Sequence, residues 1–556
     1  MENRKCKMEN MGGLMKTLKE DIEFFVKKIE YIIPLIITAI LSFGFVITHY
    51  SVNIDTLSSE RYYREGELLT QSRYGGVLLD KILGVMEYNP FFVDCLAVIF
   101  LVMASITFCI LFKKISKNKI NTVAYTIFSC LFVSYPLINE IFVYTPMSFG
   151  VCFSFFIAAV ILNLLYSYRD NKKIRSLVYS TLLMCLIISI YESSAAVLLC
   201  GFFIIEILDC IYNNPKKKIK DTIINLIIMV IPMVVALIIN SIISNLIFTI
   251  GDISPNANRA AKTIMYQTLG IANGIINLIK TVFYSYGVNG FLYLPITVMQ
   301  IACIITFILG IVYAVKRKNI TIFLLFLGSI CSLFVLSIIQ GNAAPYRTCQ
   351  VFQIFSAFAF MILIQSLIYT NKAKLMKNIF ICLSFLVIFY QAKDLNKYFY
   401  LNYTRYEQEK IALVSMAERL KEQYDIENKP VVFVGNYELS NYIIERCYIR
   451  TDTIGAKIAN VLASNFNPNN EKYSEKYKYI YKPIDSNINS YLNWGTRAFS
   501  EVNTEILKWL DILGYDYFKQ GTENMLADTI LKINDGTVPL ERNTIYEFDD
   551  YILAII

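Results

Sequence analysis

Long runs of apolar residues dominate the first 395 positions of the chain. Each run is close to the roughly twenty residues that an α-helix needs to cross a bilayer, and short polar segments separate the runs. Only Glu192 divides the fifth run from the sixth, which predicts a tight hairpin there. The pattern predicts eleven membrane-spanning helices, at residues 30–49, 91–112, 120–137, 146–166, 177–191, 193–212, 222–250, 290–315, 320–340, 346–370 and 378–393.

The pattern changes after residue 395. Residues 396–424 mix apolar and charged positions, which predicts an amphipathic helix that either lies along the membrane surface or supports the C-terminal residues. Residues 429–437 predict a buried strand, residues 495–520 a mainly helical segment, and the terminal YEFDDYILAII a turn and a final strand. We therefore expect a transmembrane domain at 1–395 with an outer loop at 49–90, a juxtamembrane helix at 396–425 and a small α/β domain at 426–556.

Lysine and arginine beside the ends of the helices predict the orientation, because cytoplasmic loops retain them. With the N-terminus inside, the inner loops carry eighteen basic residues, while the outer loops carry eight basic and eight acidic residues. An odd number of helices then places the C-terminal domain outside. The expected fold class is an all-α polytopic membrane protein of about eleven helices, in the cell membrane, with a small extracytoplasmic α/β domain.

The composition agrees with this pattern. Hydrophobic residues make up 56% of the 556 positions and charged residues 17%, which excludes an ordinary soluble enzyme and a disordered chain. The net charge of +8 divides into +13 for residues 1–395 and −5 for the rest. The basic excess therefore reflects membrane topology, and we expect no nucleic-acid partner.

Familiar soluble-enzyme motifs are missing from the sequence. It contains no Gly-rich phosphate loop, no G-x-S-x-G elbow and no C-x-x-C pair. Because His49 is the only histidine, a zinc site with two histidine ligands is excluded within one chain. The remaining candidates for catalysis are acids and arginines at the outer ends of the helices. Burying an ionisable group near the membrane costs free energy, so such groups usually face a cavity or a partner.

Four outer segments carry such groups. They are the long first loop with Asp55 and Arg73, the turn with Glu140 and Tyr144, the helix end at Tyr191 and Glu192, and the segment that contains Arg347. An acid there can take the proton from an attacking sugar hydroxyl, while arginines hold a phosphate leaving group through charge-assisted hydrogen bonds. Structural roles are equally open: Asp55 as a helix cap, and Arg73 as a partner of Glu67 or a headgroup contact.

The layout resembles the GtrII-type family of polytopic glucosyltransferases, which belong to the GT-C class. The resemblance rests on NIDTLS followed by TQSRYGG, on SYPLINEIFVYTPMSFG, ISIYESSAAV and APYRTCQV, and on KPVVFVG with the terminal DDYILAII. It is expected to cover nearly the whole chain. The sequence departs from the family pattern at four positions, where Asp, Gly, Trp and Gln are replaced by Thr56, Ser72, Tyr74 and Glu192.

The resemblance implies that glucose, or a related hexose, moves from a polyprenyl-phosphate donor to a cell-surface glycan on the outer face of the membrane. It implies Asp55 and Glu140 as catalytic acids. The substrate-binding residues that it implies are Gln71, Arg73, Tyr74, Tyr144, Tyr191, Glu192 and Arg347.

Two other classes of function remain open from the sequence. One is a transporter or flippase of lipid-linked glycans, and the other is a surface-polysaccharide polymerase or ligase. No cofactor is certain, because Asp55, Glu60 and Glu140 are oxygen ligands suited to a divalent metal without requiring one. The composition, rich in Ile, Lys, Asn and Tyr, is typical of an AT-rich bacterial genome. The expected partners are a lipid-linked sugar donor, a surface glycan and membrane lipid.

Overall fold

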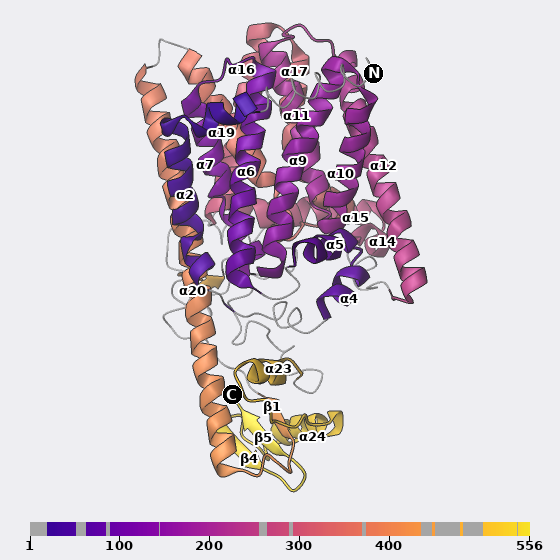
Figure 1. Ribbon diagram of the computed structural model, residues 1–556, viewed down its shortest axis with the longest axis vertical. Helices are drawn as coiled ribbons and strands as arrows, with labels where there is room; N and C mark the ends of the chain where they lie inside the picture. Colours follow the sequence, from indigo (N-terminus) through magenta and orange to yellow (C-terminus); the bar gives the residue numbers. More distant parts are fainter. Residues whose placement is uncertain are drawn as a thin grey trace, which may run out of the picture. The chain divides into compact units, whose positions relative to one another are not determined.

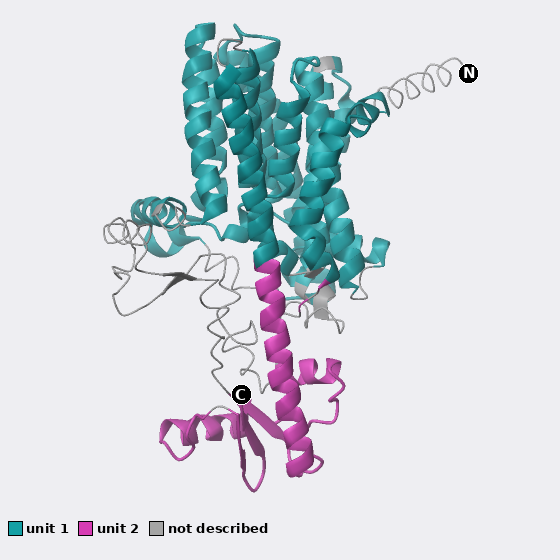
Figure 2. Cartoon of the chain, turned by 90° about the vertical axis from the view of Figure 1, so that its left-hand side faces the viewer, with its two compact units in different colours: residues 1–48, 65–397, 461–472 teal, residues 49–64, 398–460, 473–556 magenta. Residues whose placement is uncertain are grey.

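The computed structural model describes residues 19–49, 51, 63–84, 89–143, 145–254, 264–288, 293–369, 374–434, 448–450, 479–481, 504–541 and 543–556. The chain divides into two compact units (Figure 2), which are described separately. The membrane unit comprises residues 1–48, 65–397 and 461–472, and the C-terminal unit comprises residues 49–64, 398–460 and 473–556.

The membrane unit is a bundle of long apolar helices (Figure 1). Among the described residues, nine helical stretches are long and apolar enough to cross a membrane, and two further apolar helices, α10 and α17, are shorter. Each of these eleven stretches overlaps one of the eleven predicted helices, which confirms the all-α polytopic membrane fold. The predicted helix at 320–340 is interrupted, since α17 (Ile320–Ser332) ends before α18 (Val335–Gln340) begins. The main helices are α2 (Ile29–Thr48), α6 (Pro90–Ser116), α7 (Thr122–Val133), α9 (Thr145–Asn171), α10 (Ile174–Ile190), α11 (Ser194–Tyr212), α12 (Ile219–Gly251), α16 (Leu294–Arg317), α17 (Ile320–Ser332) and α19 (Val351–Tyr369).

Short elements gather between the long helices. They are α4 (Tyr63–Thr70), α5 (Tyr74–Leu83), the 3₁₀ turn η1 (Pro136–Ile138), α8 (Asn139–Val143), α14 (Met265–Leu269), α15 (Ile271–Val282), the π-helical turn η2 (Phe283–Val288), α18 (Val335–Gln340) and the 3₁₀ turn η4 (Tyr346–Thr348). Figure 1 shows α5, α14 and α15 at the same end of the bundle. This end of the membrane unit holds the candidate site.

Local sequence signals fix several ends of the long helices. The side chains of Asn89, Asn121 and Asn319 accept hydrogen bonds from backbone N–H groups in the first turns of α6, α7 and α17, which satisfies donors that a helix start leaves open. The last turns of α6 and α16 contain basic residues, which complement the negative end of the helix dipole. The predicted hairpin at Glu192 is confirmed, since α10 ends at Ile190 and α11 begins at Ser194.

The last predicted membrane helix and the predicted juxtamembrane helix form one continuous helix, α20 (Lys374–Gln423). The C-terminal part of α20 buries Leu413, Met416, Ala417 and Leu420 in the core of the C-terminal unit, around the fully buried Trp509. The apolar face of this segment therefore supports the C-terminal residues. Of the two roles that its pattern left open, the structure favours this one.

The C-terminal unit holds a three-stranded sheet in the order β1 (Val431–Val434), β5 (Ile552–Ile555), β4 (Thr544–Glu547). β1 and β5 are parallel, with Val431 opposite Ile552, and β4 is antiparallel to β5. A separate pair is formed by β2 (Tyr448–Arg450) and β3 (Tyr479–Tyr481). The predicted strands at 429–437 and at the terminus are present as β1 and β5.

Helices in this unit differ from the prediction. The segment 495–520 was expected to be mainly helical, but its described part contains α23 (Thr504–Ile512), which ends shortly before Gly514 at φ +90°. α24 (Glu523–Asn534) and β4 were not predicted. Thr522 marks the start of α24, because its side chain accepts a hydrogen bond from the Met525 backbone N–H. The proposed boundaries at residues 395 and 425 stay a prediction.

Candidate functional site

Four segments of the membrane unit supply the described candidate residues. Each segment lies where a long helix starts or ends: α5, the stretch from η1 to α8, the turn between α10 and α11, and η4 with the start of α19. Contacts between these segments link them in pairs. The polar residues that the sequence places hundreds of positions apart are thus gathered at one end of the bundle.

Arg73 and Tyr191 form the first pair. The Arg73 guanidinium carbon lies 4.8 Å from the centre of the Tyr191 ring, a cation–π arrangement that orients the cation. Arg73 Nη1 is also 3.6 Å from the Met147 sulfur. Both side chains are buried, with 8% of Arg73 and 3% of Tyr191 exposed. Tyr191 therefore supports the arginine rather than offering an open ring face.

Close packing of α5 on α10 positions Arg73, which precedes the first residue of α5. A Cβ atom on Gly75 would lie 2.1 Å from Ser189 Oγ and 3.1 Å from the Leu186 carbonyl oxygen, so only glycine permits this approach. The Tyr74 hydroxyl donates a hydrogen bond to Asn240 Oδ1 of α12. Helix α5 is thus fixed to two long helices.

Gln71 and Ser72 form the turn that leads into Arg73. Ser72 adopts φ 61°, a left-handed conformation that glycine enters at no steric cost. The backbone N–H of Gln71 donates to the Leu68 carbonyl oxygen at 3.2 Å.

Glu140 and Arg347 form the second pair. Glu140 belongs to α8 and is 7% exposed. Its carboxyl group interacts with both the charge and the backbone amide of Arg347. Arg347 lies in η4 with an exposed side chain. A buried acid therefore lies next to an arginine that remains accessible.

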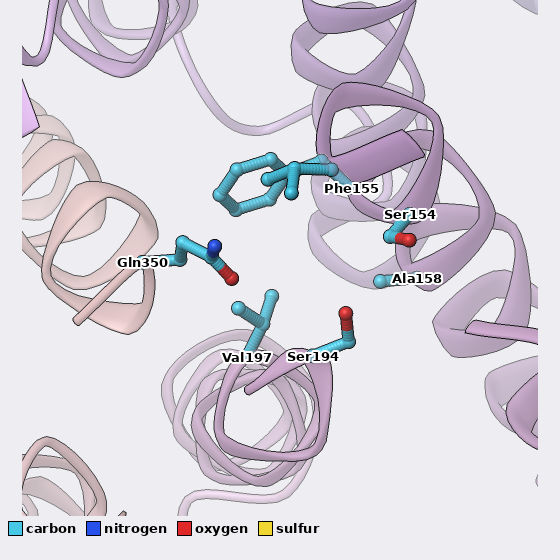
Figure 3. A pocket seen from close by; sticks show the side chains of 7 residues that line it. Ser154, Phe155, Ala158, Ser194, Val197 and Gln350 are labelled. Atoms are coloured by element: carbon cyan, nitrogen blue, oxygen red, sulfur yellow. The ribbon is translucent and has the colours of Figure 1, made fainter. Parts of the chain in front are cut away.

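Gln350 connects the turn between α10 and α11 to the Arg347 segment. Its Oε1 accepts a hydrogen bond of 2.6 Å from Ser193 Oγ, and its Nε2 donates to the Arg347 carbonyl oxygen at 3.3 Å. Figure 3 shows the Gln350 side chain facing a narrow pocket that side chains of α9 and α11 also line, among them Ser154 and Ser194. Glu192, in the same turn, is exposed.

Asp94 is an acid at this end of the bundle that the sequence analysis missed. It lies in the second turn of α6, is 1% exposed, and accepts a 2.7 Å hydrogen bond from Ser148 Oγ. Ser148 directly follows Met147, which contacts Arg73. The sequence offered one signal for Asp94, a carboxylate inside an otherwise apolar helix. Gln350 offered a similar one, an amide in an apolar run, because polar groups at such positions usually have a partner.

Two predicted site residues, Asp55 and Tyr144, lie outside the described residues. A metal site was left open by the sequence. Among the side chains that the structure describes, no group of three or more His, Cys, Asp or Glu residues is arranged to hold a metal ion. Asp55 and Glu60, two of the possible oxygen ligands, lie outside this part of the chain.

Comparison with known proteins gives one match. The family model described as Glucosyl transferase GtrII matches residues 44–364, a stretch that contains every segment of the candidate site. The match ends before α20, so the predicted resemblance of KPVVFVG and DDYILAII lies outside it. No curated protein and no solved structure matches the chain.

Proposed function

The chain belongs to the GtrII glucosyl transferase family, and from this premise we propose which substrates this membrane-embedded glycosyltransferase uses. The donor is a polyprenyl-phosphate sugar, carrying glucose or a related hexose, and the acceptor is a cell-surface polysaccharide on the outer face of the membrane. The observation that carries the proposal is that two arginines at one end of the bundle each lie beside a specific side chain: Arg73 beside Tyr191, and Arg347 beside Glu140.

The distribution of charge supports an outer location for this end. The loops after α6, α9, α11 and α16 lie at the other end of these helices and hold clusters of lysine and arginine. Such clusters are retained in the cytoplasm. The candidate site then faces outward, where a lipid-linked donor reaches it laterally from the bilayer.

Arg73 and Arg347 bind the phosphate of the donor in this proposal. Guanidinium groups present several N–H donors in a plane and match phosphate oxygens closely. Since Tyr191 and Met147 hold Arg73, its guanidinium is oriented before the donor arrives, and less free energy is spent on ordering it. Tyr191 is therefore a positioning residue for Arg73, while Tyr74 and Tyr144 keep the proposed role of contacting the sugar.

Asp55, together with Glu140, orients or deprotonates the acceptor hydroxyl. The hydroxyl oxygen forms a bond to the anomeric carbon of the sugar, its proton passes to the carboxylate, and the bond between the anomeric carbon and the phosphate oxygen breaks. The polyprenyl phosphate leaves with its negative charge held by the arginines. Gln71 and Glu192 contribute to binding, and the C-terminal unit contributes to recognition of the acceptor glycan.

The test is a transfer assay in membranes supplied with radiolabelled polyprenyl-phosphate glucose. Asp55→Asn and Glu140→Gln are compared with the matched control Asp252→Asn, which changes an exposed acid just beyond α12. We expect transfer by Asp55→Asn to fall at least a hundredfold and the control to match the wild type. Full activity of a stably inserted Asp55→Asn protein would remove Asp55 from the mechanism.

The assay also separates the competing functions. Label recovered covalently in polysaccharide indicates transfer, whereas intact donor moved across sealed vesicles indicates a flippase. Transfer to an acceptor added outside sealed, right-side-out vesicles tests the outer location directly. Activity that appears only after the vesicles are opened would contradict it.

A further inference from the structure

A closed ring of four paired charges occupies the end of the membrane unit away from the candidate site. Arg169 Nη1 is 2.9 Å from Glu206 Oε1 and its Nη2 is 2.5 Å from Asp209 Oδ1. Lys217 Nζ contacts the same two acids, Glu206 Oε2 at 2.5 Å and Asp209 Oδ2 at 2.9 Å. Two cations balance two carboxylates, so the ring is neutral and its buried charges are paired.

Asparagine amides complete the ring. Asn225 donates to Glu206 at 3.3 Å, while Asn213 and Asn214 donate to Asp209. Glu206 and Asp209 are buried, and Arg169 keeps the largest exposed side-chain fraction of the four, at 18%. The ring therefore ties α9, α11 and α12 together and presents its arginine at the edge.

A small surface pocket lies against that arginine. One part of its wall is polar, formed by Arg169, Lys172 and Asn225. The remainder is apolar or aromatic and comes from α9, α11 and α12: Leu165, Tyr166, Ile205, Ile228 and Met229. The pocket is thus amphipathic, with cationic groups beside an apolar wall.

Lys172 gives the pocket a charge that the ring does not neutralise. Its side chain is exposed, its ammonium lies 5.7 Å from the Tyr168 ring, and none of the ion pairs between described residues includes it. At the start of α12, Lys218 and Lys220 outnumber Asp221, the acid of its first turn. An anion is therefore favoured at this place over a neutral or cationic group.

The apolar wall continues toward lipid. α12 lines the pocket with Ile228 and Met229, and its outer positions Ile224, Ile227 and Ile231 are about half exposed. An exposed apolar face on a membrane helix contacts acyl chains. The pocket is also about 33 Å along α9 from Met147, at 1.5 Å per residue, which places it at the other membrane surface.

We propose that this pocket binds the headgroup phosphate of an anionic phospholipid from the surrounding leaflet, with one acyl chain along α12. Lys172 and Arg169 face the phosphate, and Ile228 and Met229 contact the chain. This site is separate from the transfer site and does not depend on the donor. Basic pockets between membrane helices are suited to such headgroups.

Native mass spectrometry of the full-length protein tests the proposal, with phosphatidylglycerol and phosphatidylcholine of identical chains as probes. We expect wild type to retain phosphatidylglycerol preferentially. Lys172→Gln should weaken its binding about fivefold, the effect of one lysine near an anionic lipid. The matched control Lys318→Gln, which changes an exposed lysine at the same end of the bundle beyond α16, should leave binding unchanged.

A second variant keeps every charge. Ile228→Trp fills the apolar part of the pocket and should also lower phosphatidylglycerol binding several-fold, whether or not it affects sugar transfer. Equal retention of the two lipids by wild type, or unchanged binding in both Lys172→Gln and Ile228→Trp, overturns the proposal. Displacement of the lipid by free sn-glycerol 3-phosphate at equal concentration overturns it as well, because the ligand is then a soluble phosphate.

Discussion

Arg73 and Tyr191 illustrate what single residues contribute at the candidate site. A buried guanidinium is costly unless its environment compensates it, and the aromatic face of Tyr191 and the sulfur of Met147 both contribute to that compensation. The sequence identified both residues as part of one site. It did not indicate that the tyrosine acts through the arginine.

Replacing Tyr191 separates the two roles of its side chain. Tyr191→Leu removes the aromatic face, and we expect kcat/KM for sugar transfer to fall about five- to thirtyfold, since a desolvated cation–π contact contributes about 1–2 kcal/mol. Tyr191→Phe keeps the ring and should retain most of the activity. A leucine variant as active as the phenylalanine variant would argue against the positioning role.

The residue scale also shows why some site residues escaped prediction. Asp94 and Gln350 lie within or beside long apolar runs, where one polar side chain barely changes the hydropathy pattern. Their significance depends on the partners Ser148 and Ser193, which other helices supply. Glu140 and Arg347 were predicted singly, but which acid lies beside which arginine required the tertiary structure.

At the scale of elements, the contact between α5 and α10 decides where Arg73 lies. A helix without a side chain at Gly75 approaches its neighbour more closely than two ordinary helices do. The sequence RYGG contains two adjacent glycines, and the structure distinguishes them. Gly75 faces Ser189 and Leu186, whereas a Cβ on Gly76 would meet only Leu68 Cδ1 at 3.7 Å.

This difference supplies a matched pair of variants. Gly75→Ala should lower the free energy of unfolding by about 1–3 kcal/mol through overpacking. It should also displace Arg73, so that transfer activity falls at least tenfold. Gly76→Ala gains the same helix propensity without a clash and should be at least as stable as the wild type. Thermal unfolding in detergent and the transfer assay measure both effects. Equal behaviour of the two variants would mean that α5 is not held by close contact.

At the scale of the whole molecule, two units with different cores share the helix α20. The membrane unit buries the interior faces of its apolar helices, while the C-terminal unit packs the end of α20 against a small sheet and Trp509. The C-terminal unit also carries surface ion pairs, among them Lys532 with Asp528.

Asp528 gives the C-terminal unit an acid-sensitive contact. Hydrogen bonds from Lys532, and next from the Tyr551 hydroxyl, hold the pKa of this carboxyl below its ordinary value. A depressed carboxyl pKa contributes stability that is present above the unfolded pKa of about 3.9 and is lost as the pH falls through the folded pKa. The affected window therefore lies below about pH 4.

Asp528→Asn should flatten the pH dependence of unfolding in that window. Fluorescence of Trp509 in the full-length protein, with the second tryptophan replaced by Trp494→Phe, reports on the C-terminal unit. Asp550→Asn, which changes an exposed acid in the turn before β5, serves as the control and should keep the wild-type profile. An unchanged profile for Asp528→Asn would show that its contacts contribute nothing to stability.

The sequence by itself determined where the membrane helices lie, which of their ends carry basic residues, and which segments between them hold acids and arginines. These are local properties, because the free energy of placing a helix in a bilayer depends mainly on its own residues. The tertiary structure alone decided that Arg73 contacts Tyr191, that Glu140 lies beside Arg347, and that Arg169 and Lys217 share two carboxylates. Such pairings depend on how each helix is rotated against its neighbours, and that rotation is set by packing between segments far apart in the chain.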